Sequence, residues 1–138
     1  MPITKTKIFM NFYGKKGTSK KIPASYNQQL VLTISYQHIE LGTGKWTSKG
    51  FYLLKGSSIK KKYEGKSNHG VESVIKKLLE DNAIADDGTT DEYYVLKNDI
   101  GLYSPSTAAR LVHGNDRNGL IHWMLEDKTL GYLLNEST

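Results

Sequence analysis

The 138-residue sequence contains no cysteine. This absence excludes disulfides, cysteine-bound zinc, iron–sulfur clusters and a thiol nucleophile. No apolar run approaches the roughly 18 residues of a membrane-spanning helix, and residues 1–5 lack the apolar stretch of a secretory signal. We therefore expect a cytoplasmic protein that does not enter a membrane, with a length that suits one compact domain.

Acidic residues are scarce in the first half of the chain. Residues 1–66 hold 13 Lys and only two acids, Glu40 and Glu64, which gives a net charge of +11. Residues 67–138 hold six basic and 12 acidic residues, a net charge of −6. A separation of this size directs association with partners more than it determines a fold. Two interpretations stay open: the basic half binds a polyanion, or its lysines only keep the surface hydrated.

The spacing of apolar residues predicts several short strands. Apolar side chains alternate along residues 30–36, which is typical of a half-buried strand. Further strands are predicted at residues 8–13, 50–55, 93–96, 100–102 and 120–125. Gly42–Gly44 is predicted to break the chain, Asn118-Gly119 to form a hairpin turn, and the acidic segment 86–91 to be a solvated turn.

Two segments have the signals of helices. Apolar residues recur at helical spacing over residues 71–79, which predicts an amphipathic helix. A second helix is predicted to start at Pro105 with Ser104 as its cap and to stop at Gly114. The sequence therefore predicts a single compact α+β domain of short, largely antiparallel strands and two short helices. We expect a basic N-terminal β extension over residues 1–48 and a small α+β module over residues 49–138.

Catalytic and metal-binding patterns are missing. The segment 42–47 starts like a dinucleotide or phosphate loop, but Trp46 and Thr47 occupy positions that both motifs need for other residues. The four histidines show no i, i+4 pair, and the basic half has only two acids, Glu40 and Glu64, which are weak material for the convergent carboxylates of a nuclease. Ser104 is better explained as a helix cap than as a nucleophile. We expect no catalytic residues, no metal and no cofactor.

Nucleic-acid binding has more support, because lysines cluster next to aromatic residues. Two lysine doublets surround a Gly-Thr-Ser turn, and Lys60–Lys62 is followed by Tyr63. The candidate phosphate-binding residues are Lys15, Lys16, Lys20, Lys21, Lys45, Lys60, Lys61, Lys62, Tyr63, Arg110, Arg117 and Asn118. Lysines contact phosphates, whereas the arginines that discriminate between bases are few, so we expect salt-sensitive binding with little sequence specificity.

Two further features, Trp123 and the turn at Arg117–Gly119, each allow two interpretations. Trp123 is predicted to be a core residue, with a ligand platform as the alternative. The turn at Arg117–Gly119 is either a site of polar recognition or plain hairpin chemistry. Ala108, Ala109, Leu111 and Val112 are predicted to pack the second helix against the core.

The second half of the chain resembles a known small domain. A helix with the sequence Ser104-Pro105-Ser106-Thr107-Ala108-Ala109 is followed by Gly114, Asn118-Gly119 and Trp123. This order is similar to a domain of unknown function at the C-terminal ends of some GIY-YIG-type nucleases and restriction–modification proteins. The resemblance covers about residues 50–134. It implies an accessory module of DNA-processing systems, with no catalytic residues to carry over.

This sequence departs from the family's usual context, because residues 1–48 are too few for the catalytic domain and lack the GIY and YIG pairs. The leading hypothesis is a non-enzymatic module that binds nucleic acid or a nucleic-acid-processing assembly through a basic face. The alternative is a phage or mobile-element inhibitor that binds a host defence protein or sequesters a nucleotide signal.

Overall fold

A seven-stranded sheet forms the main body of the protein. The structure is a computed structural model, which describes residues 12–13, 30–47, 50–65, 70–86, 88–116 and 119–136. The strand order is β1-β8-β4-β3-β2-β9-β10. The bounds are β1 Phe12–Tyr13, β2 Leu30–Tyr36, β3 Ile39–Thr47, β4 Gly50–Leu53, β8 Ile100–Leu102, β9 Met124–Leu125 and β10 Lys128–Thr129. All pairings are antiparallel except that of β1 with β8.

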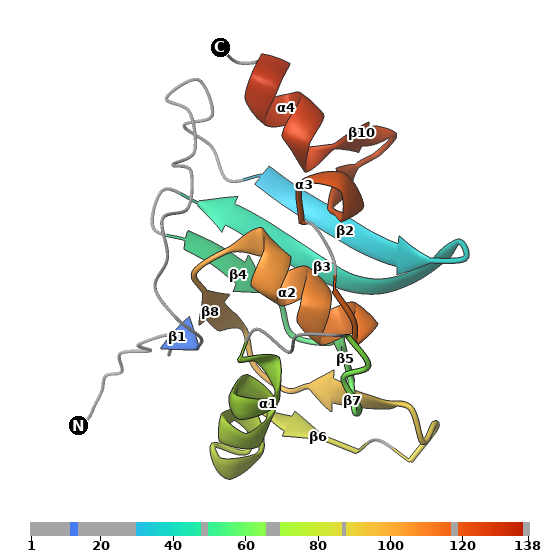
Figure 1. The fold of residues 1–138 in the computed structure, drawn as a ribbon, viewed down its shortest axis with the longest axis vertical. Coiled ribbons are helices and arrows are strands. Elements are labelled where there is room, and N and C mark those ends of the chain that lie inside the picture. The colour runs from blue at the N-terminus through green and yellow to red at the C-terminus, as the bar shows by residue number, and fades with distance from the viewer. Residues whose placement is uncertain are drawn as a thin grey trace, which may run out of the picture.

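A second, three-stranded sheet and four helical segments complete the described fold. The small sheet has the order β5-β7-β6, formed by β5 Ser58–Lys60, β7 Tyr93–Leu96 and β6 Ile84–Ala85. The helices are α1 Val71–Glu80, α2 Pro105–His113, α3 Gly119–His122 and α4 Leu130–Glu136. In Figure 1, α1 and the small sheet lie at one end of the molecule, and α3 and α4 lie at the other. The predicted α+β class is confirmed, and the two predicted helices are α1 and α2.

Helix α2 covers one face of the large sheet and closes the core. It contacts β3, β4 and β8, as Figure 1 shows. Its Ala108, Ala109, Leu111 and Val112 are fully buried, as predicted. The predicted ends of the helix are confirmed as well: the Ser104 hydroxyl accepts a hydrogen bond from the Thr107 N–H at 3.1 Å, and Gly114 has a φ of 75°.

The predicted break at Gly42–Gly44 is wrong, because β3 runs straight through these residues. Gly44 faces the core, and a Cβ atom at this position would overlap the ring of Phe51. That ring lies 4.8 Å from the Trp123 ring, measured between centroids. The glycine therefore makes room for an aromatic cluster over the strand instead of ending it.

The predicted strand at residues 120–125 is wrong too. The chain forms the short helix α3 and then the two-residue strand β9. The Gly119 N–H donates to the Ser106 hydroxyl at 2.9 Å, and the Trp123 indole N–H donates to the Pro105 carbonyl at 2.9 Å. Contacts with the first turn of α2 therefore decide the structure of this segment. In the predicted Asn118-Gly119 hairpin turn, Gly119 instead begins α3, and Asn118 lies outside the described residues. The hairpin comes later, between β9 and β10.

Trp123 is a core residue, as predicted, since its side chain is fully buried. The boundary predicted between residues 48 and 49 falls between β3 and β4, which pair with each other through Trp46 and Phe51. Both residues are buried in the same core cluster. The two predicted segments therefore share one sheet and one core.

Among the described residues, no helix is long and apolar enough to cross a membrane.

Candidate polyanion-binding site

The basic run Lys60–Lys62 lies at the end of β5, beside an acidic loop. This loop connects β6 to β7, and its described residues are 86 and 88–92. Strand β5 pairs with β7, which places Lys60 opposite Tyr93, and the Lys61 N–H donates to the Glu92 carbonyl at 2.9 Å. The folding of the small sheet therefore brings together a basic and an acidic segment that are distant in the sequence.

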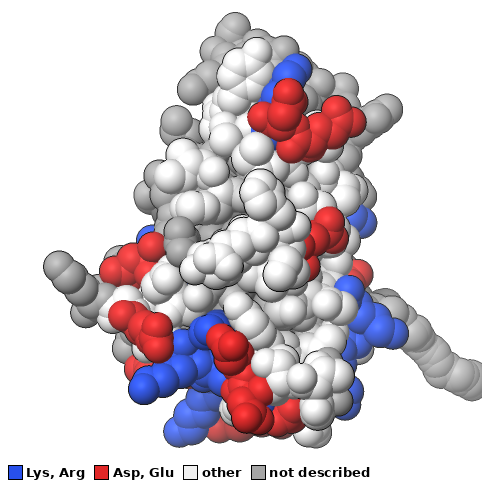
Figure 2. All heavy atoms as spheres, turned by 90° about the vertical axis from the view of Figure 1, so that its right-hand side faces the viewer, with Lys and Arg blue, Asp and Glu red and all other residues white. Residues whose placement is uncertain are grey.

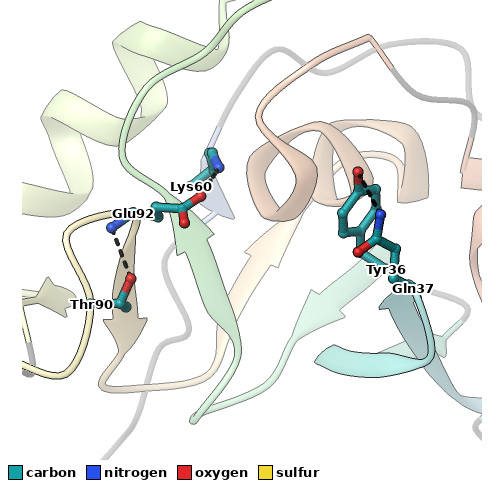
Figure 3. Close-up of polar contacts among 5 residues, drawn as sticks. All are labelled: Tyr36, Gln37, Lys60, Thr90 and Glu92. Atoms are coloured by element: carbon teal, nitrogen blue, oxygen red, sulfur yellow. Dashed lines mark hydrogen bonds and ion pairs between the residues drawn. The ribbon is translucent and has the colours of Figure 1, made fainter.

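Two lysines of the basic run form ion pairs with the acidic loop. Lys60 Nζ lies 2.8 Å from Glu92 Oε1, as Figure 3 shows, and Lys61 Nζ lies 2.5 Å from Asp86 Oδ2. These hydrogen bonds raise the pKa of both lysines and lower the pKa of both carboxyl groups. Lys62 is exposed and forms no ion pair within the described part of the chain.

Each paired lysine also lies over a tyrosine ring. Lys60 Nζ is 4.9 Å from the ring centroid of Tyr93, and Lys61 Nζ is 5.2 Å from that of Tyr94. A cation over an aromatic face is held electrostatically, so these rings help to fix the ammonium groups in place. The ring and the carboxylate together therefore hold each ammonium group in a defined position.

The acidic loop is held in shape by its own side chains. The Gly88 N–H donates to Asp86 Oδ1 at 3.0 Å, and the Glu92 N–H donates to the Thr90 hydroxyl at 3.0 Å (Figure 3). Short side chains that bond the backbone two residues further on are a common way to stabilise a turn. The loop carboxylates are thus presented to the lysines from an ordered turn.

The model of a protein family matches residues 32–132, and its description is a domain of unknown function, DUF4357. The chain belongs to this family. No curated protein and no solved structure matches it. The match begins in β2 and ends in α4, so the DUF4357 domain includes β2 and β3, which were predicted to belong to an N-terminal extension.

Other candidate residues of the DUF4357 domain are dispersed. Tyr63 is 8% exposed and its hydroxyl donates to the carboxylate of Asp116, so this ring lies in the core and is not presented to a base. Arg110, on α2, lies near enough to act on the Tyr63 hydroxyl electrostatically. Lys45 lies on β3 next to Trp46, so its side chain points to the sheet face opposite the core.

Six predicted site residues lie outside the described residues: Lys15, Lys16, Lys20, Lys21, Arg117 and Asn118. The described residues contain ten Lys and Arg against 13 Asp and Glu, so the basic excess of the whole sequence comes from the other positions. Within the described ranges, no group of three or more His, Asp or Glu side chains is placed to hold a metal ion.

The sequence interpretation missed the contact between the acidic loop and the basic run. It treated the loop as a solvated turn because nothing local relates it to lysines 25 and 32 positions earlier. Figure 2 shows the result: positive and negative side chains intermix at the lower end of the molecule, where Figure 1 places the small sheet. The opposite charges of the two segments were the available signal.

A second missed feature is the tip of the β2–β3 hairpin. Its central residues, Gln37 and His38, have φ of 52° and 68°, a backbone that favours glycine or asparagine. The flanking Tyr36 and Ile39 pair across the turn and are 48% and 64% exposed. The Gln37 amide donates to the Tyr36 hydroxyl at 3.4 Å (Figure 3). Figure 2 looks onto this side of the molecule and shows a broad area without charged side chains.

The raised pKa of Tyr63 predicts that the folded protein loses stability at high pH. Burial, with help from the hydrogen bond to Asp116, raises the pKa of Tyr63 from 10.0 to about 12. Because the folded-state pKa lies above the unfolded one, this stabilisation is complete below pH 10 and lost as the pH approaches 12. We expect the stability advantage of the wild type over Tyr63→Phe to shrink by about 2 kcal/mol between pH 10 and pH 12. Urea unfolding at successive pH values measures it, and parallel pH profiles of the two proteins would contradict it.

Proposed function

We propose that this DUF4357 protein is a non-enzymatic module that binds the phosphate backbone of nucleic acid through Lys60–Lys62. The observation that carries this proposal is the geometry of Lys60 and Lys61. Both ammonium groups lie at the surface, each is held over a tyrosine ring, and each already donates to a carboxylate oxygen. Phosphate oxygens are acceptors of the same kind for these donors.

The existing ion pairs are weak enough to be exchanged. Exposed lysine–carboxylate pairs contribute only about 0.2–1 kcal/mol each, and here the Glu92 and Asp86 side chains are 67% and 53% exposed. A nucleic acid gains additional free energy because lysines that neutralise its phosphates release condensed counterions. The lysines of residues 1–29 add to the same attraction in this proposal.

The resemblance to domains of nuclease and restriction–modification systems supports a role in DNA processing. We propose that the module acts in the cytoplasm beside a DNA-processing protein, and that it places that protein on a nucleic acid without strong sequence preference. Lysine point charges contact phosphates but do not distinguish between bases, which agrees with such a role.

A second candidate function is binding of a protein, as a phage or mobile-element inhibitor of a host defence system would do. The exposed pair Tyr36 and Ile39 favours it, because large apolar side chains at a projecting hairpin tip are typical of protein contacts. Residues with a positive φ, such as Gln37 and His38, are also more common at functional positions. The same inhibitor could instead act by sequestering a nucleotide signal through its lysines.

Salt titration tests the proposed function. We expect the protein to bind a labelled 20-base-pair duplex at low salt, with an affinity that falls linearly with salt on a log–log plot. Lys60→Gln/Lys61→Gln/Lys62→Gln should weaken binding and flatten the slope by about two to three units, since each phosphate contact contributes about 0.9. Fluorescence anisotropy from 20 to roughly 200 mM KCl measures both quantities.

The matched control is Lys76→Gln/Lys97→Gln/Lys128→Gln. It removes the same charge from exposed positions on α1, in the turn after β7 and on β10, respectively. It should leave the slope nearly unchanged. Equal losses in both triple variants would show that only net charge matters. No binding of duplex or single-stranded DNA or RNA by the wild type at low salt would contradict the proposal and favour the hairpin tip as the functional surface.

A further inference from the structure

The acidic loop is attached to the basic run by three contacts. Glu92 and Asp86 each accept from a lysine ammonium group, and the Glu92 carbonyl accepts from the Lys61 N–H. The lysines lie 32 and 25 positions from their partners, and both partners come from one loop. A loop that is ordered by its own turns and meets two consecutive lysines is a defined contact of the fold.

Each loop carboxylate takes an acceptor position at a lysine ammonium group that a phosphate oxygen would also need. The Lys60 side chain is 20% exposed and that of Glu92 is 67% exposed, so the carboxylate lies on the solvent side of the pair. The pair of Lys61 and Asp86 has the same arrangement, with 22% and 53% exposed. A phosphate approaching either ammonium group from solvent therefore competes with a carboxylate of the same chain.

We propose that the acidic loop is an intramolecular competitor, which a nucleic acid must displace before Lys60 and Lys61 bind its phosphates. This inference rests on the proposed function, because it describes the regulation of the same lysines. Lys62 is exposed and carries no such carboxylate within the described residues, so it remains open to a first phosphate contact. The loop thereby selects for ligands that offer several phosphates at once over single phosphate groups.

The size of the effect follows from the strength of exposed ion pairs. Each such pair changes an equilibrium by a factor of about 1.5 to five. Removing both carboxylate charges should therefore tighten binding of a duplex about tenfold, and each single change should tighten it about threefold. Removing the carboxylate charges should increase the affinity for inorganic phosphate less than the affinity for the duplex. A single phosphate group cannot contact Lys62 at the same time as Lys60 or Lys61.

The variant Asp86→Asn/Glu92→Gln tests this inference. Asn at position 86 keeps the acceptor for the Gly88 N–H, and Gln at position 92 keeps the main-chain bond to Thr90, so the loop retains its shape. The matched control Glu80→Gln/Glu126→Gln raises the net charge by the same two units from exposed positions on α1 and the β9–β10 turn. Fluorescence anisotropy with the 20-base-pair duplex at about 50 mM KCl measures affinity, and circular dichroism checks folding.

A tenfold tightening in Asp86→Asn/Glu92→Gln, with less than twofold in the control, supports the competitor. The gain should vanish when Lys60→Gln and Lys61→Gln are added, and its persistence there would overturn the inference. Equal tightening in both double variants would overturn it too, while the proposed function would stand. If neither the wild type nor any variant binds, both the inference and the proposed function fail. The single variants Asp86→Asn and Glu92→Gln provide the same comparison if the double variant does not fold.

Discussion

Replacing Trp123 with alanine should destabilise the fold by about 5 kcal/mol. The side chain is fully buried, packs on Phe51 at 4.8 Å between ring centroids, and donates its indole N–H to the Pro105 carbonyl. Truncation of a buried tryptophan costs about 3–5 kcal/mol through the cavity it leaves, and the unpaired carbonyl adds to this loss. Because domains are typically stable by about 5–15 kcal/mol, much of the variant should be unfolded under mild denaturation.

Urea unfolding followed by far-ultraviolet circular dichroism measures this effect without relying on tryptophan emission. Trp123→Phe separates the two contributions, because it keeps an aromatic ring but loses the N–H donor, and we expect a loss of about 2 kcal/mol. Tyr132→Ala is the surface control, since this side chain is 50% exposed, and it should change stability by less than about 1 kcal/mol. A loss in Trp123→Ala no larger than in Tyr132→Ala would contradict the placement of Trp123.

Replacing Gly119 with alanine should destabilise the protein by about 3 kcal/mol, although alanine is the better helix former. Gly119 is the first residue of α3. Helix propensity alone would favour alanine by about 1 kcal/mol. However, a Cβ atom at this position would lie 2.5 Å from the Pro105 carbonyl carbon and 2.6 Å from the Ser106 nitrogen. These are backbone atoms in the first turn of α2, which cannot move aside cheaply, so overpacking decides the sign.

Thermal and urea unfolding of Gly119→Ala measure this sign directly. The control Ile121→Ala changes a 58% exposed side chain in the same helix and should cost less than about 1 kcal/mol. This control shows whether α3 is merely sensitive to any substitution. Unchanged or increased stability of Gly119→Ala would show that α3 does not pack on α2 as described.

The helices α1 and α2 could be predicted because their signals are local. The apolar residues of α1 repeat within ten residues, and α2 has its cap, its proline and its terminal glycine in the adjacent sequence. The strands at β2 and β7 were predicted for the same reason. The segment 120–125 was not, because a short apolar run fits a strand and a buried helical turn equally well. Only the contacts of Gly119 and Trp123 with α2 distinguish the two.

The candidate site was predicted only in part. Lys60–Lys62 stands out in the sequence as a basic run, but its ion pairs with Glu92 and Asp86 depend on the pairing of β5 with β7. Tyr63 follows the lysines in sequence, yet the fold buries its ring against Asp116. Spacing along the chain shows which residues are present, whereas exposure and partners depend on strand pairing.

The absence of cysteine, the charge separation and the two helices are properties of the sequence itself, because each is decided by composition or by neighbouring residues. Which charges remain available to a partner was decided only by the tertiary structure. The small sheet places the acidic loop on the basic run, so charges separated along the chain partly neutralise each other in space. The physical reason is that salt screens exposed charges beyond about 10 Å, and the fold alone determines which groups lie closer than that.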